Sequence, residues 1–193
     1  GTLGIVTAAT LKLIPRPEPR STLLCAFDSE ERALSGALEI LEKGRTPSIL
    51  EFIDTLSVKG AEETLGKTFF DDFPNPSLLL VELDGRREEI RDDMNHLEAW
   101  AKSNASAYRS SSSAQEAESL WEARRKCSGA MFRLGNTKLN EDVVVPLDRM
   151  GDLMKEIRAL RARANLQIAV FGHAGDGNLH VNIMYDRNDR DAT

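Results

Sequence analysis

The sequence predicts an α+β domain, in which an antiparallel or mixed sheet carries helices packed on one face. Strand-like apolar runs alternate with amphipathic helical segments, but they lack the long uniform βαβα pattern of a doubly wound parallel sheet. The last two strand-like runs are joined directly through a glycine-rich turn, as in a hairpin. This order favours two related ferredoxin-like halves, although no internal sequence repeat accompanies them.

The first twenty residues predict a boundary between two domains. Residues 5–14 have the composition of a strand, and Pro15, Pro17 and Pro19 end it, because alternating prolines favour an extended linker over a central strand. We therefore expect a terminal strand over residues 1–14, a linker over 15–20 and the main domain over 21–193. Because the chain opens within a strand-like run and without a start methionine, we expect it to be a fragment.

The first part of the main domain is predicted from apolar periodicity and turn residues. Helix 29–43 places Leu34, Leu38 and Leu41 on one face. The expected elements are strands over residues 22–27, 48–53 and 77–83, helices over 29–43, 55–65 and 87–102, and a loop with an apolar patch over 69–76.

The second part follows the same logic. Residues 110–113 are serines that can cap the next helix, and Pro146 closes a strand. The basic residues Arg158, Arg161 and Arg163 are interpreted as the solvated face of a helix. The expected elements are strands over residues 105–109, 139–145, 166–171 and 180–184, and helices over 114–134 and 147–164. In the last helix the expected inward residues are Met150, Leu153, Met154, Ile157 and Leu160.

Composition excludes several classes of function. The chain has 193 residues and a formal charge of −6, which argues against a nucleic-acid-binding surface. Cys25 and Cys127 form no disulfide framework, which fits a reducing compartment. No apolar run approaches the roughly 20 residues that span a bilayer, and no signal peptide is evident. We expect a cytoplasmic protein; peripheral membrane attachment and a homodimer are left open.

The segment from His173 to His180 is the strongest candidate site. The chain has three histidines, and two of them bracket this glycine-rich turn. If the flanking strands pair, both imidazoles can reach one divalent ion such as zinc, iron or manganese, which would act as a Lewis acid. The alternative is a tight hairpin whose glycines serve the turn and whose histidines face solvent. A phosphate cradle is not expected, because no helix follows the turn.

The element His-Ala-Gly-Asp-Gly-Asn-Leu-His over residues 173–180 resembles the signature of the C-terminal domain of FAD-linked oxidases. This flavoprotein group contains D-lactate dehydrogenases, the FAD subunit of glycolate oxidase and D-2-hydroxyglutarate dehydrogenase. Residues 1–13 resemble the last strand of that group's FAD-binding domain, and residues 141–146 resemble a strand that precedes a helix. The three segments occur in the order of the family.

The resemblance implies a cap domain that covers the flavin, with His173 and His180 as metal ligands. The expected third ligand, a glutamate beside the histidine that serves as base, lies downstream of this chain, so no catalytic residue is assigned here. Where some members carry a lysine, this chain has Asn140, and Lys138 lies two residues away. The implied substrate contacts are Arg124, Ser128, Asn140 and Asn182. The implied cofactor contacts are Gly1, Thr2, Gly4 and Ile5, with FAD bound mainly by the missing domain.

The leading hypothesis is the substrate- and metal-binding cap domain of an FAD-dependent 2-hydroxy-acid dehydrogenase, inactive as an isolated fragment. Its partners would be a small 2-hydroxy acid and an electron acceptor such as a quinone, a cytochrome or an electron-transfer flavoprotein. The alternative of a different class is a non-enzymatic metal-binding or interaction module. A third possibility keeps the family but involves no net oxidation.

Overall fold

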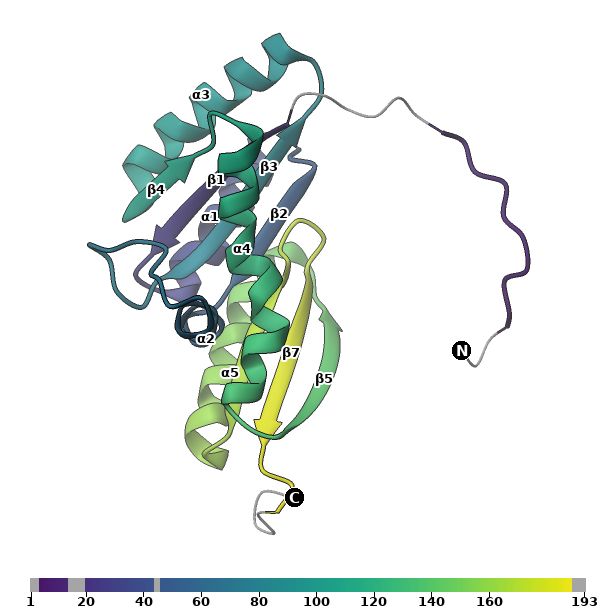
Figure 1. The fold of residues 1–193 in the computed structure, drawn as a ribbon, viewed down its shortest axis with the longest axis vertical. Helices are drawn as coiled ribbons and strands as arrows, with labels where there is room; N and C mark the ends of the chain where they lie inside the picture. Colours follow the sequence, from purple (N-terminus) through teal and green to yellow (C-terminus); the bar gives the residue numbers. More distant parts are fainter. Residues whose placement is uncertain (1–3, 14–19, 44–45, 189–193) are drawn as a thin grey trace.

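The computed structural model describes residues 4–13, 20–43 and 46–188. Within them the strands form one sheet in the order β4-β1-β3-β2-β6-β7-β5, and every neighbouring pair is antiparallel (Figure 1). The strands are β1 (Arg20–Phe27), β2 (Ile49–Ile53), β3 (Ser77–Asp84), β4 (Ala107–Ser110), β5 (Thr137–Val144), β6 (Gln167–His173) and β7 (Asn178–Tyr185). The helices are α1 (Glu30–Glu42), α2 (Thr55–Leu65), α3 (Arg87–Asn104), α4 (Ala114–Ala130) and α5 (Met150–Ala164).

The predicted α+β class and antiparallel sheet are confirmed. Strands β1 to β4 are arranged in the ferredoxin-like order 4-1-3-2, with α2 as an addition between β2 and β3. The run β5-α5-β6-β7 repeats the run β1-α1-β2-β3, and its strands lie in mirrored order across the sheet. The two halves meet where β2 pairs with β6, over residues 51–53 and 171–173.

The expectation that the helices cover one face is wrong. Helices α1, α3 and α5 pack with one core cluster, whereas α2 and α4 pack with a second cluster on the opposite face (Figure 1). The physical reason is visible in β1, where Leu23, Cys25 and Phe27 face the first cluster and Leu24 and Ala26 face the second. A strand that is apolar on both sides needs cover on both sides.

Capping residues place the helix starts where the sequence predicts them. The backbone N–H groups of Arg32, Ser57 and Glu116 donate to the side chains of Ser29, Asp54 and Ser113. The helix expected over 114–134 ends at Ala130 and continues as a 3₁₀ turn over Met131–Arg133. The most buried face of α1 is formed by Ala33, Leu34, Ala37 and Ile40, while Leu38 and Leu41 are only half-buried.

The structure also corrects the predicted burial of residues in α5 and in the loop over residues 69–76. In α5 the buried residues are Met150, Met154 and Ile157, and Leu153 and Leu160 are half-buried. The apolar patch expected in loop 69–76 is part of the core, because Phe69 and Phe70 are buried. None of the described helices combines the length and apolar content that crossing a bilayer requires.

The N-terminal segment differs most from its prediction. Residues 4–13 form no strand and extend away from the sheet (Figure 1). Ile5 is 91% and Leu13 86% exposed, so the apolar side chains have no strand or core to pack against. Residue 14 and the linker prolines lie outside the described residues, and Arg20, expected in the linker, begins β1.

Candidate functional site

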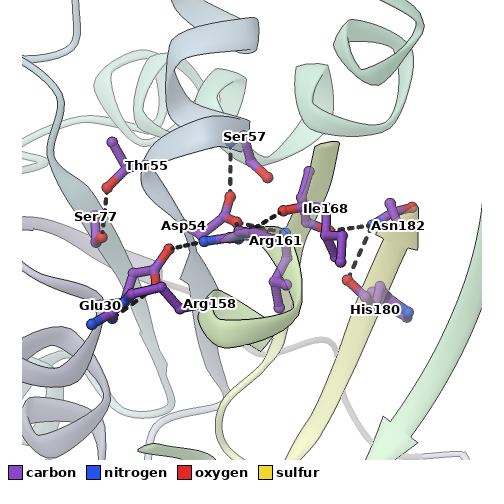
Figure 2. Close-up of polar contacts among 12 residues, drawn as sticks. Glu30, Asp54, Thr55, Ser57, Ser77, Arg158, Arg161, Ile168, His180 and Asn182 are labelled. Carbon is purple, nitrogen blue, oxygen red and sulfur yellow. Dashed lines mark hydrogen bonds and ion pairs between the residues drawn. The ribbon is translucent and has the colours of Figure 1, made fainter. Parts of the chain in front are cut away.

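Strand register brings the candidate residues to one face of the sheet. Glu51 of β2 lies opposite His173 of β6, and His180 of β7 lies opposite Asp142 of β5. Asn182, two residues beyond His180, lies opposite Asn140 on that same face. Helix α4 packs over this side of the sheet, and Figure 2 shows His180 and Asn182 along β7.

The two histidines approach each other as the sequence predicts. Their ring centroids are 5.2 Å apart and the rings are nearly perpendicular. Each Nδ1 pairs with a carboxylate: His173 with Glu51, and His180 with Asp142 at 2.5 Å. A carboxylate accepts, so Nδ1 donates in both pairs, and this contact lowers the pKa of Asp142 below its ordinary value.

These pairs fit a metal-binding role. Metal-bound histidines usually donate their second nitrogen to a carboxylate, which fixes the ring and leaves the other nitrogen for the ion. Imidazoles that share an ion at a metal–nitrogen distance of about 2.0 Å have centroids roughly 5 Å apart, close to the separation here. The described residues hold no group of three histidine, cysteine, aspartate or glutamate side chains that could bind an ion. Within the described residues, His173 and His180 therefore do not complete a metal site.

Arg124 lies beside this pair on α4. Its Nε donates to Oε2 of Glu51, and its guanidinium carbon lies 4.7 Å from the centroid of the Phe171 ring. The Arg124 side chain is 18% exposed, and among the described residues Glu51 is its hydrogen-bond partner. The two terminal nitrogens of the planar guanidinium can therefore bind a carboxylate through two hydrogen bonds.

The other predicted substrate contacts lie around these groups. Ser128, one helical turn beyond Arg124, accepts a 3.2 Å hydrogen bond from Nζ of Lys138. Lys138 shares a strand face with Asn140 and Asp142. The structure thus places Lys138, which lies two residues from the family position, against the predicted site residue Ser128.

Asn182 is fully buried and has an unused acceptor. Its Nδ2 donates to the backbone oxygens of Ala169 at 3.2 Å and His180 at 3.0 Å (Figure 2). Its Oδ1 is buried without a hydrogen-bond partner among the described residues, and so is Oδ1 of Asn178 on the same strand face. A buried polar atom without a partner is costly, so these oxygens favour an additional donor at the site.

A cavity of about 570 Å³ opens next to Arg124 and His173. Its wall includes Ile49, Glu51, Trp121, Arg125 and Asp176. This volume is large enough for a small organic acid.

Not every predicted site residue reaches this face. Gly4 and Ile5, expected near the cofactor, lie in the exposed N-terminal segment, and Gly1 and Thr2 are outside the described residues. His96 is exposed on α3, with Nδ1 2.6 Å from the backbone oxygen of Asp92. Sequence reasoning missed Glu51, although a charged residue within the apolar run of residues 49–53 signals a buried polar role.

Comparison with known proteins places this arrangement in a family. Residues 16–193 match the family described as FAD linked oxidases, C-terminal domain. The chain belongs to this family. It is 36% identical to glycolate oxidase subunit GlcD of Bacillus subtilis over 99% of this chain and 40% of that protein. It is 29% identical to a D-lactate dehydrogenase of Anaerostipes hadrus over 94% of this chain and 39% of that protein. The chain therefore spans about two fifths of the length of these relatives.

Solved structures share the fold at low sequence identity. A p-cresol methylhydroxylase with bound substrate has a TM-score of 0.67 at 10% identity, over 91% of this chain and 41% of that one. An alkyldihydroxyacetonephosphate synthase has a TM-score of 0.61 at 13% identity, over 89% of this chain and 38% of that one. The fold of this domain is thus shared by proteins whose names indicate different activities.

Proposed function

We propose that this chain is the substrate- and metal-binding domain of an FAD-dependent oxidoreductase that oxidises a small 2-hydroxy acid. The observation that carries the proposal is the convergence of His173, His180 and Arg124 on one face of the sheet. The named relatives, a glycolate oxidase subunit and a D-lactate dehydrogenase, support the same class of substrate.

In this proposal each group has a separate role. His173 and His180 would hold a divalent ion, which supplies Lewis acidity toward the substrate hydroxyl. Arg124 would bind the substrate carboxylate through its guanidinium, while Phe171 keeps the guanidinium plane in place. Oδ1 of Asn182 would accept a hydrogen bond from substrate or bound water. FAD, when bound, supplies the hydride acceptor.

The remaining parts would come from outside this chain. We propose that residues 1–14 belong to the FAD-binding domain, and that FAD, a third metal ligand and the proton acceptor are provided by segments beyond these 193 residues. The chain spans about two fifths of the length of the two named relatives, which is compatible with further parts of the site lying elsewhere in the protein. The isolated chain would then bind metal weakly and show no turnover.

The proposal is tested by titrating Zn²⁺ alone, and then glycolate or D-lactate, into the purified chain by calorimetry. We expect weak Zn²⁺ binding that is lost in His173→Ala and in His180→Ala. His96→Ala is the matched control, because His96 is an exposed histidine of α3 and should leave binding unchanged.

Two results would count against the proposal. Zn²⁺ binding that survives both substitutions would place the metal elsewhere. Metal binding without any effect of glycolate or D-lactate, in the chain and in the FAD-containing full-length protein, would favour a non-enzymatic metal-binding module.

A further inference from the structure

We propose that Glu51 is a positioning residue that orients His173 and Arg124 together, so that one carboxylate holds the metal-binding and the carboxylate-binding parts of the site. This inference rests on the proposed function. In it, Glu51 would act through His173 and Arg124 and would not itself bind the metal or the substrate.

The position of Glu51 explains how one side chain reaches both groups. Its neighbours Leu50 and Phe52 point into the opposite core cluster, so Glu51 faces α4. It lies directly across from His173 in the β2–β6 pair, and its side chain is 5% exposed. Oε1 accepts a hydrogen bond from Nδ1 of His173, and Oε2 accepts a hydrogen bond from Nε of Arg124. Both oxygens are thus engaged by the two proposed functional residues.

Each contact leaves the functional atoms of its partner available. Because Glu51 accepts from Nδ1, the His173 proton is held on Nδ1, and Nε2 keeps its lone pair for an ion. Because Glu51 accepts from Nε of Arg124, the two terminal nitrogens stay available for a substrate carboxylate. Loss of Glu51 would therefore disturb both functions, although His180 would remain in place.

Two other carboxylates on this face provide matched comparisons. Asp142 supports His180 alone, and its side chain is 59% exposed. Glu82 is buried like Glu51, but it binds Thr22 and Trp121 instead of the site residues. Removal of Asp142 should affect only metal binding, and removal of Glu82, which contacts neither histidine, should leave metal binding unchanged.

The experiment compares Glu51→Ala, Asp142→Ala and Glu82→Ala with the unmodified chain. The ring nitrogens of His173 are observed by ¹⁵N NMR without metal, above the ordinary histidine pKa of about 6.5. Zn²⁺ alone is then titrated, followed by glycolate at saturating Zn²⁺. Glu51→Gln is added in case the alanine variant does not fold.

We expect Glu51→Ala to shift the His173 proton from Nδ1 toward Nε2 and to weaken Zn²⁺ binding by roughly 10–100-fold. It should also weaken glycolate binding. Asp142→Ala should weaken Zn²⁺ binding only, and Glu82→Ala should leave the His173 proton position and the Zn²⁺ affinity unchanged. Glu51→Gln has one acceptor oxygen in place of two. It should therefore retain either the His173 proton on Nδ1 or glycolate binding, but not both.

An unchanged His173 proton position in Glu51→Ala would overturn the inference, as would equal losses of Zn²⁺ affinity in Glu51→Ala and Glu82→Ala. If the unmodified chain binds neither Zn²⁺ nor glycolate, the proposed function fails. The NMR measurement would then still decide whether Glu51 orients His173.

Discussion

At the scale of single residues, Gly177 shows that the turn between the histidines is shaped by the backbone. Its φ is +76°, and a Cβ at this position would lie 2.2 Å from the backbone oxygen of Val145. The backbone N–H of Val145 donates to the oxygen of Gly177 at 3.1 Å, which ties the turn to the end of β5. Part of the hairpin interpretation is therefore confirmed, because this glycine serves the turn, while the metal interpretation stays a proposal.

Gly177→Ala should destabilise the fold. The added methyl group meets strain at positive φ and a backbone oxygen that cannot move freely, so we expect a loss of at least about 1–3 kcal/mol in the free energy of unfolding. Urea denaturation measures this loss.

The control is Gly129→Ala, which adds a methyl group to α4 where no atom lies within 4 Å. This change should stabilise the protein by roughly 0.5–1 kcal/mol, because alanine favours a helix over glycine. Equal effects of the two substitutions would contradict the assigned role of Gly177.

Arg124→Lys should separate charge from geometry at the proposed carboxylate site. Lysine keeps the positive charge beside Glu51 but lacks the planar fork, so we expect glycolate binding to weaken by about tenfold or more, with Zn²⁺ binding largely retained. Calorimetry on the Zn²⁺-loaded chain measures both values.

Arg133→Lys is the comparison, since Arg133 is 54% exposed, pairs with Glu63 and does not line the cavity beside Arg124. It should leave glycolate binding unchanged. A loss that appears equally in both variants would show that Arg124 has no special role.

The sequence predicts the two histidines of the site but not Glu51. His173 and His180 are predicted from two signals: eight residues that form a hairpin must bring their ends together, and residues 173–180 resemble the family signature. Glu51 lies more than a hundred residues from His173, and its role depends on the pairing of β2 with β6, which no local pattern predicts. Its only signal is a carboxylate within an otherwise apolar strand.

At the scale of elements, α2 begins at a buried aspartate that also joins both halves of the sheet. Asp54 caps α2 through the N–H of Ser57 at 2.8 Å and accepts from the N–H of Val170 on β6 at 2.8 Å. Arg161 of α5 donates to it at 2.5 Å (Figure 2). Burial raises the pKa of Asp54 to about 6, because Arg161 and Ser57 only partly offset desolvation.

This raised pKa predicts a pH dependence of stability. The folded state holds the Asp54 proton more tightly than the unfolded state, where the pKa is about 3.9. Stability from this group is therefore complete below about pH 4 and is lost as the pH rises toward about 6. The loss should amount to a few kcal/mol, at roughly 1.4 kcal/mol for each pKa unit.

Urea unfolding at several pH values measures this slope, and Asp54→Asn should remove it. The exposed carboxylates with lowered pKa, among them Asp142 and Asp186, act in the opposite direction and below about pH 4. A slope between pH 4 and 6 that persists in Asp54→Asn would assign it to another group.

Local signals predict the elements of this domain well and their packing less well. Ser29, Asp54 and Ser113 mark helix starts, because a cap acts within one turn. The two-sided cover of the sheet was missed although β1 and β3 are continuous apolar runs, which indicate burial on both faces. Residues 4–13 have strand composition but no strand beside them, and a strand requires a partner.

At the scale of the whole molecule, the two halves share both hydrophobic core clusters and are also joined by a short strand pair and by a buried ionic cluster. Arg161 of α5, in the second half, binds Asp54 and also Glu30 of α1, at 3.0 Å, in the first half (Figure 2). Its Nε donates to the backbone oxygen of Ile168 at 2.7 Å. The interpretation of Arg161 as a solvated helix residue is therefore wrong, since its side chain is 20% exposed and its partners are nearly buried.

Arg161→Ala should weaken the connection between the halves more than any exposed arginine does. It leaves Asp54 and Glu30 buried without their main cation, which costs about 3–5 kcal/mol when one partner of a buried ion pair is removed. Because β2 and β6 pair over only three residues each, we expect the halves to lose cooperativity. Hydrogen exchange of strands β5–β7 should become faster than that of β1–β3.

Arg158→Ala tests whether this effect depends on burial. Arg158 lies on the same helix, binds Glu30 and Glu31, and is 50% exposed. Its removal should cost less than about 1 kcal/mol, because water screens an exposed pair. If Arg158→Ala and Arg161→Ala reduce stability equally, or if exchange in both halves accelerates together in Arg161→Ala, the ionic cluster is not the connection that couples the two halves. The orientation of Glu51 toward His173, which spans the same β2–β6 junction, would then be independent of this cluster.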